Sequence, residues 1–340
     1  MRMKKLMLFA VAALALASCS KTFDTNKSEG TAIGFGTWAE TLTKARAQGS
    51  STFVSGDSFN VEGFKTVGGA NTTVFDDVAV SYDGTNWTYT NTRFWDSNAT
   101  SYTFFAVSNP TTALTFAADG TIAATAVTFA GNNNDILLAN SVEVEPPYSS
   151  TPVALTFKHI GSLVDLKVKK SATLDDADAT VAITAVALEK IDGAGNVAVT
   201  GYTSNVPAVA WTGLDGNTTY TNASGVTPVA TLPTDVGTTG DDLINTLVVI
   251  PQTLADTKIL KISYTITDAA GTVNTFTNTE IKLNQFDKTD DTDNTTPFIT
   301  GWEAGKHYVY TLTIDANTIN FTGSITDWDT AVNGYNYLVQ

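Results

Sequence analysis

Short runs in which apolar and polar residues alternate recur along this chain, and they limit it to a β fold. In one example the alternating run 78–82 is followed by the turn signal Asp83-Gly84 and by a second run at 87–89, an order that predicts a hairpin. Because no long stretch repeats apolar residues at helical spacing, we expect an all-β protein built of sandwiches or barrels. Similar runs lie at 101–107, 153–158, 163–169, 181–190, 246–250, 259–267, 272–283, 308–314 and 318–325.

Chain length and a cluster of prolines predict two domains. Behind an apolar N-terminal stretch the chain has about 320 residues, more than a single hydrophobic core usually serves. The segment 145–152 holds three prolines, and prolines so close together do not fit inside a central strand. We therefore expect one β-sandwich over residues 50–149 and a second over residues 150–340.

The charge of the chain argues against nucleic acid as a partner. The formal net charge is -15 and the pI is near 4.4, whereas nucleic-acid binding depends on clustered Lys and Arg that release counterions. An acidic surface suits a protein exposed outside the cytoplasm, because like charges keep its copies dispersed.

The start of the chain resembles the export signal of a bacterial lipoprotein. Basic residues precede the apolar stretch 6–17, which is too short to span a bilayer. Cys19 is the only cysteine, and Leu16-Ala17-Ser18-Cys19 resembles the lipobox. We expect residues 1–18 to be a signal peptide and Cys19 to carry acyl chains such as palmitate, which contribute about 0.8 kcal/mol per buried methylene to membrane binding. Ordinary secretory cleavage beside an incidental cysteine is the alternative.

The sequence contains no catalytic, cofactor or metal motif that we could identify. Metalloprotease, nucleophile-elbow, Walker A and dinucleotide patterns are all absent. His159 and His307 have no Cys, His or paired carboxylates near them in the sequence, so we interpret both as structural or exposed. We expect no enzyme activity, no cofactor and no metal. A hydrolase with a carboxylate pair formed in space is the alternative.

Two other features could in principle bind ligands. The acidic run 287–294 offers oxygen ligands of the kind that calcium prefers, but it lacks the glycine and glutamate of an EF-hand. We interpret this run and 175–178 as solvated loops, and cation binding at 287–294 stays open. The six tryptophans could stack on sugar rings, but a Trp inside an alternating run belongs more often to the core.

Segments spread over most of the chain resemble the fimbrillin family of Bacteroidetes, the lipoprotein precursors of type V pili. Their order and spacing behind the lipobox carry the resemblance. In the first half they are Ile33-Gly34-Phe35, Trp87-Thr88-Tyr89, Arg93-Phe94-Trp95, 102–106 and Asp135-Ile136-Leu137-Leu138-Ala139. In the second half they are 155–159, Val249-Ile250-Pro251-Gln252, Trp302, Gly305, 308–312, Ile319-Asn320-Phe321 and 325–328.

The resemblance implies a fold and a mode of assembly rather than an activity. It implies two tandem transthyretin-like, Greek-key β-sandwiches, and a precursor anchored at the outer membrane through lipidated Cys19. Proteolysis and strand exchange would then build an extracellular pilus. The implied partners are other pilus subunits, the membrane, a trypsin-like activating protease and a surface ligand of a host or another microbe.

The resemblance also assigns roles within residues 19–49. The segment 31–38 is expected to be a plug strand that fills its own groove, with Ile33 and Phe35 on one face by period two. Such a strand covers an edge that would otherwise recruit another chain. Family members are cut after an arginine in an exposed connector, which points to cleavage between Arg46 and Ala47.

The C-terminal tail would supply the donor strand. Tyr335, Tyr337 and Val339 alternate with their neighbours, as a strand that adds to another subunit requires. A strand of the tail's own domain is the alternative. A cleavage site together with a spare terminal strand favours a stalk subunit over an anchor or a tip. The competing functions are a pilus tip adhesin and an anchored surface lipoprotein that binds glycans.

Overall fold

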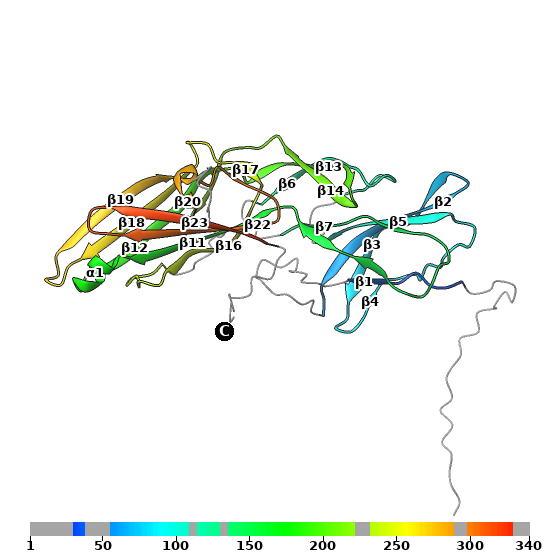
Figure 1. Ribbon diagram of the computed structural model, residues 1–340, viewed down its shortest axis with the longest axis horizontal. Helices are drawn as coiled ribbons and strands as arrows, with labels where there is room; N and C mark the ends of the chain where they lie inside the picture. The colour runs from blue at the N-terminus through cyan, green and yellow to red at the C-terminus, as the bar shows by residue number, and fades with distance from the viewer. Residues whose placement is uncertain are drawn as a thin grey trace, which may run out of the picture. The chain divides into compact units, whose positions relative to one another are not determined.

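The computed structural model describes residues 30–37, 55–108, 114–129, 135–221, 232–288 and 298–328. Thr31–Gln340 form one unit, separate from Met1–Gly30. Among the described residues, helical structure is confined to the short α-helix α1 (Ala172–Asp176) and the 3-10 turn η1 (Leu283–Gln285) (Figure 1). The predicted all-β sandwich class is confirmed.

The first half of the described chain forms a wide sheet and a narrow one. The wide sheet has the order β10-β7-β5-β2-β3-β4, and β8 also pairs with β5. The narrow sheet pairs β1 with β9. Both sheets contribute to one buried cluster, in which Phe59 and Phe104 of the wide sheet meet Phe35 and Leu155 of the narrow one. The bounds are β1 Phe35–Thr37, β2 Ser58–Val67, β3 Ala70–Tyr82, β4 Trp87–Thr88, β5 Ser101–Ser108, β7 Leu137–Ala139, β8 Val142–Val144, β9 Val153–Leu155 and β10 Phe157–His159.

The hairpin predicted around 78–89 is confirmed. Strands β3 and β4 pair antiparallel, with Tyr82 opposite Trp87. Asp83 fixes the turn, because its Oδ1 accepts the backbone N–H groups of Thr85 and Asn86 at 2.7 Å each. A carboxylate that bonds the backbone two and three residues ahead is the usual reason for Asp at the start of a turn.

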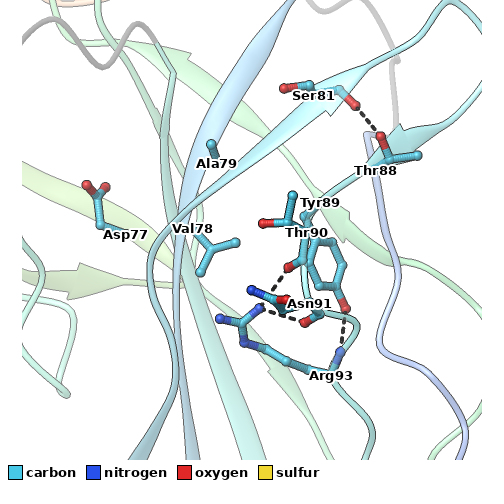
Figure 2. A pocket seen from close by; sticks show the side chains of 9 residues that line it. All are labelled: Asp77, Val78, Ala79, Ser81, Thr88, Tyr89, Thr90, Asn91 and Arg93. Atoms are coloured by element: carbon cyan, nitrogen blue, oxygen red, sulfur yellow. Dashed lines mark hydrogen bonds between the residues drawn. The ribbon is translucent and has the colours of Figure 1, made fainter. Parts of the chain in front are cut away.

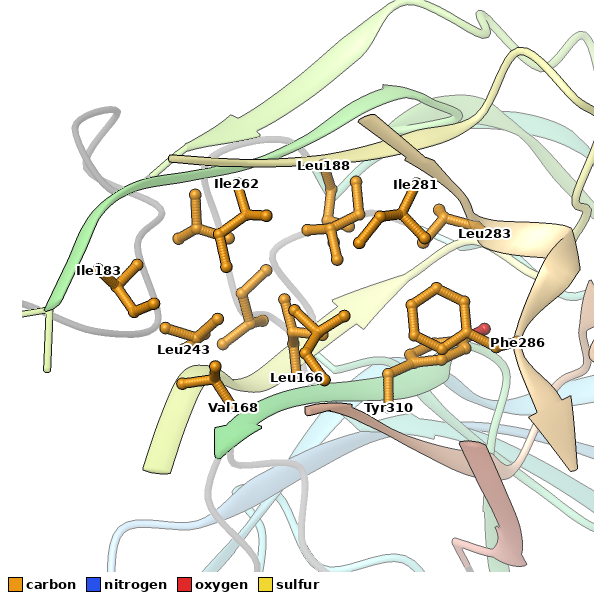
Figure 3. Close-up of a cluster of buried hydrophobic side chains, with 14 of the residues drawn as sticks. Leu166, Val168, Ile183, Leu188, Leu243, Ile262, Ile281, Leu283, Phe286 and Tyr310 are labelled. Carbon is orange, nitrogen blue, oxygen red and sulfur yellow. The ribbon is translucent and has the colours of Figure 1, made fainter. Parts of the chain in front are cut away.

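The second half forms a sandwich of a five-stranded and a four-stranded sheet. Their orders are β16-β11-β22-β23-β20 and β15-β12-β18-β19. The core between them is aliphatic, with Leu166 and Val168 on one sheet facing Leu188 and Ile262 on the other (Figure 3). The bounds are β11 Ser162–Lys170, β12 Thr180–Ile191, β15 Thr218–Thr221, β16 Asp241–Val249, β18 Ile259–Thr267, β19 Val273–Lys282, β20 Asp287–Lys288, β22 Lys306–Ile314 and β23 Ile319–Asp327; the small pair is β17 Gln252–Thr253 with β21 Gly301–Trp302.

A three-stranded sheet joins the two halves of the sequence. Its order is β14-β13-β6, with β6 at Ile122–Thr128, β13 at Ala194–Thr203 and β14 at Val206–Thr212. A buried cluster beneath it contains Phe105 and Phe129 from the first half and Val248 and Ile250 from the second. In addition, β9 and β10 lie beyond residue 149 but pair with strands before it. The boundary between residues 149 and 150 stays a prediction.

A buried polar cluster explains the Val249-Ile250-Pro251-Gln252 segment. The Nε2 of Gln252 donates to Ile250 O at 2.8 Å and to Asp192 O at 3.2 Å, and its Oε1 accepts the Asp192 N–H. The Asp192 carboxylate in turn lies 2.6 Å from Lys258 Nζ. Since buried polar groups are costly unless they are bonded, Gln252 serves to satisfy the backbone of Asp192 and Ile250.

Candidate functional site

Residues 31–37, called the N-terminal segment below, bond to other parts of the chain along both edges. On one edge β1 runs parallel to β9, with Phe35 opposite Val153. On the other edge the Ile33 N–H donates to Arg93 O at 2.8 Å. The segment is therefore a strand inserted between the chain around Arg93 and β9.

The side chains of Ile33 and Phe35 are the buried face of this segment. They are 2% and 4% exposed, respectively. The Phe35 ring meets four aromatic rings edge-on at centroid distances of 5.1 to 6.5 Å, and these rings belong to Phe59, Phe75, Tyr89 and Phe104. Burying a Phe side chain contributes about 1.5–3 kcal/mol, and an aromatic pair adds about 0.5–1.5 kcal/mol. This aromatic cage is the main side-chain anchor of the segment.

Two glycines allow the close packing around the cage. A Cβ at Gly63 would lie 2.8 Å from the Phe75 ring and 3.0 Å from the Phe104 ring. On the outer face of the segment, a Cβ at Gly36 would lie 3.3 Å from Pro152. The cage and the segment thus depend on positions where any larger residue would push its neighbours apart.

Tyr89 and Arg93 hold the segment from one side (Figure 2). The Tyr89 hydroxyl donates to Ile33 O at 2.6 Å. The Arg93 guanidinium lies 4.7 Å from the centre of the Phe75 ring, and its Nε donates to Val74 O at 2.6 Å. Because Arg93 O is the acceptor for Ile33 N–H, these contacts also fix the backbone partner of the segment.

An open hollow of about 510 Å³ lies beside Tyr89 and Arg93. Two of the guanidinium nitrogens of Arg93 already donate to backbone carbonyls, as Figure 2 shows for Thr90 and Asn91. The hollow is therefore a polar surface depression next to a structural bracket. Its lining consists of Asp77, Val78, Ala79, Ser81, Thr88, Tyr89, Thr90, Asn91 and Arg93.

Glu62 is a buried carboxyl group on β2, behind the bulge that β2 and β3 share. The register of the two strands shifts between Val61 and Gly63. Burial raises the pKa of Glu62 to about 7; the backbone N–H of Asp77 opposes this rise, and the nearby carboxylates of Asp76 and Asp77 add to it. A carboxyl group of this kind changes charge near neutral pH.

Several residues predicted as sites lie outside the described residues. They are Cys19, Arg46, Ala47, Tyr335, Tyr337 and Val339. The end of the expected plug strand, Trp38, and most of the acidic run 287–294 also lie outside them. Helices long and apolar enough to cross a bilayer do not occur in the part of the chain that the structure describes.

Both histidines have carboxylate partners that the sequence did not reveal. His307 Nε2 lies 2.9 Å from Asp165 Oδ2 on the neighbouring strand. His159 Nδ1 lies 2.5 Å from Asp135 Oδ2, and both side chains are buried. Each pair joins residues that are distant in the sequence, so local spacing could not indicate it. Within the described ranges, no group of three or more His, Cys, Asp or Glu side chains could hold a metal ion.

The described tryptophans are buried or half-buried, and the acidic run 175–178 lies at the end of a short helix. Of the tryptophans that the structure describes, Trp95, Trp302 and Trp328 are buried, and Trp87 and Trp211 are half-buried. The acidic run 175–178 begins in α1, where Asp175 pairs with Lys170 at 2.9 Å. The described tryptophans therefore form no exposed platform for sugar rings.

Comparison with known proteins identifies the family. The model of the fimbrillin-like family matches residues 43–328. A fimbrial protein from Bacteroides vulgatus is 18% identical, with a TM-score of 0.59 over 87% of this chain and 99% of its own. A fimbrilin from Porphyromonas gingivalis is 10% identical, with a TM-score of 0.41 over 89% of this chain and 98% of its own. A search of curated proteins gives no match. Since the family model spans most of the sequence, this chain belongs to the fimbrillin-like family.

Proposed function

We propose that this protein is a stalk subunit of a cell-surface type V pilus that supports adhesion. Membership of the fimbrillin-like family supports a pilus subunit that assembles with other subunits at the cell surface. The finer proposal is that the chain is exported as an outer-membrane lipoprotein, anchored through Cys19, and activated by cleavage between Arg46 and Ala47. The observation that carries it is the N-terminal segment, bonded on both edges and buried through Ile33 and Phe35.

In this proposal the N-terminal segment is the plug of a groove that other subunits use. Its parallel pairing with β9 and its contact with Arg93 occupy backbone groups that would otherwise recruit a strand of another chain. Cleavage after Arg46 would leave the segment held only by noncovalent contacts. A competing strand could then replace it, with backbone bonds supplying affinity and alternate side chains supplying register.

The proposed donor is the C-terminal tail of another subunit. Tyr335, Tyr337 and Val339 alternate with their neighbours, as Ile33 and Phe35 do. An aromatic side chain of the tail would suit the cage that Phe35 fills, because its walls are four aromatic rings. The same cleavage would detach the subunit from lipidated Cys19.

The test is limited trypsin digestion of the precursor from Ser20 onward, with N-terminal sequencing and size-exclusion chromatography. We expect one cut between Arg46 and Ala47, followed by oligomers. A chain with both Lys44→Gln and Arg46→Gln is the matched control, because trypsin also cuts after lysine; it should stay intact in this connector and monomeric. If Arg46 resists trypsin, or if the cut chain stays a stable monomer, stalk assembly by this route is wrong. An anchored adhesin or glycan-binding lipoprotein would then fit better.

A further inference from the structure

His159 and Asp135 form a pair that is sealed inside the protein. The Nδ1 of His159 lies 2.5 Å from Oδ2 of Asp135, and the two side chains are 1% and 0% exposed. At this distance the two buried side chains are in direct contact, so each restrains the orientation of the other. The pair is built into the wide sheet, because His159 ends β10 opposite Leu137 of β7, and Asp135 lies just before β7.

The indole ring of Trp328 lies flat on this imidazole ring. The ring centroids are 3.6 Å apart and the planes differ by 11°. Trp328 is 9% exposed. Stacked aromatic rings stabilise each other beyond the area that they bury. A Leu or Phe at position 159 would fill space beneath Trp328 but would offer no polar atom to the Asp135 carboxylate.

The backbone of Trp328 is tied to the same place as its side chain. Its N–H donates to Gly305 O at 2.7 Å, and the Gly305 N–H donates to Gly161 O at 2.8 Å. Gly161 is two residues beyond His159. Side chain and backbone thus bring the end of β23 back to the same short stretch, from His159 to Gly161.

We infer that Asp135 and His159 form a seat for Trp328, and that this seat fixes the point from which residues 329–340 leave β23. The inference rests on the proposed function, in which those residues contain the donor strand. A donor strand that starts from a fixed point has less conformational freedom to lose when it enters the groove of another subunit. His159 and Asp135 are therefore positioning residues for assembly, acting through Trp328.

The first test uses uncut precursor from Ser20 onward, so that it does not depend on assembly. Imidazole in contact with indole quenches indole fluorescence. The emission of Trp328 is obtained by subtracting the emission spectrum of the corresponding Trp328→Phe chain from that of the chain with Trp328. This emission should be weak in the wild type and several-fold stronger in His159→Gln. The amide of Trp328 should exchange about tenfold faster in His159→Gln and in Trp328→Ala. Tyr264→Phe is the control, since Tyr264 stacks on Phe276 in a different core cluster from Trp328. Unchanged emission and exchange would overturn the seat.

The second test follows oligomer formation after the cut. The variants compared are those whose melting temperature stays within a few degrees of the wild type. His159→Gln and Trp328→Ala should form oligomers about tenfold more slowly, and Trp328→Phe should recover part of the rate. Tyr264→Phe should match the wild type. Faster exchange with a wild-type rate of assembly would overturn the link to the donor strand. If the cut wild type itself stays monomeric, the proposed function is wrong and the assembly role falls with it, while emission and exchange still decide whether the seat exists.

Discussion

Two parallel strand pairs in this protein differ in length and in the contacts that hold them. As far as the structure describes the chain, β1 pairs with β9 over three residues, from Phe35 opposite Val153 to Thr37 opposite Leu155. In the second half, β11 pairs with β22 over eight residues, and each of these strands has an antiparallel neighbour on its other edge. The first pair depends on a few side chains, whereas the second is the centre of a sheet.

In the proposed function β1 is a strand that another subunit replaces, and this difference explains how it could leave without loss of the fold. A short strand held largely by an aromatic cage could be exchanged for another strand with a similar side chain. A long central strand cannot leave without exposing the aliphatic core between two sheets. Four predictions use this contrast, beginning with the largest expected effect.

Phe35→Ala should weaken the replaceable pair most. Emptying the aromatic cage should lower the free energy of unfolding of the uncut precursor by about 3–5 kcal/mol, measured by denaturant titration. Leu166→Ala in β11 is the matched change in the permanent pair and should cost about 2–5 kcal/mol.

The effects of Phe35→Ala and Leu166→Ala on stability should differ after assembly. The proposed function has the donor strand replace the N-terminal segment, so in oligomers formed by cut chains Phe35→Ala should have no effect, while Leu166→Ala should still destabilise. A Phe35→Ala penalty that persists in oligomers would show that the segment remains in its groove.

Glu62→Gln should remove a pH dependence of the free energy of unfolding that arises in the first half of the chain. The pKa of Glu62 rises from 4.5 to about 7 on folding, so the folded protein binds this proton more tightly than the unfolded chain. The stabilisation is present below pH 4.5 and is lost as pH rises to 7. Relative to Glu62→Gln, the wild type should lose up to about 3 kcal/mol over this range. A constant difference between the two chains from pH 4.5 to 7 would contradict this.

Arg93→Lys should loosen the N-terminal segment while keeping the charge. Lysine cannot reproduce the guanidinium fork that bonds Val74, Thr90 and Asn91. We expect a loss of about 1–2 kcal/mol and faster hydrogen exchange at the Ile33 amide, whose acceptor is Arg93 O. Unchanged exchange at Ile33 would mean that the side chain of Arg93 does not support the segment.

Lys282→Ala should have the smallest effect and provides a baseline. Lys282 pairs with Asp256 at 2.7 Å, but the side chains are 42% and 69% exposed. Exposed pairs of this kind contribute about 0.2–1 kcal/mol, so the melting temperature should hardly move. A larger loss would reveal that this edge of the second sandwich is more tightly coupled to its core than its exposure suggests.

The sequence predicted strands well where alternation is regular and less well where geometry interrupts it. Apolar and polar residues alternate over most of β22 and, from Leu260 on, in the sequence of β18, and both strands lie close to their predicted ranges. Strand β2 was missed because its bulge near Gly63 shifts the alternation by a residue. Strand β13 was missed because Ala, Gly and Thr dilute its pattern. The helix α1 has five residues, too few for a periodic signal.

The candidate site was predictable only in part, because contacts across the fold have no local signal. Period two correctly placed Ile33 and Phe35 on one buried face. The hydrogen bond from Tyr89 to Ile33 joins residues 56 positions apart. The stack of Trp328 on His159 likewise joins segments that the sequence related to a family but not to each other.

The order of strands around β11 has a consequence for the timing of folding. Both neighbours of β11 follow it in the sequence, and Leu163 finds its partner His307 only near the end of the chain. Sheets closed by such distant pairings form slowly. The second sandwich can therefore be completed only once nearly the whole polypeptide is available, so its core forms after synthesis rather than during it.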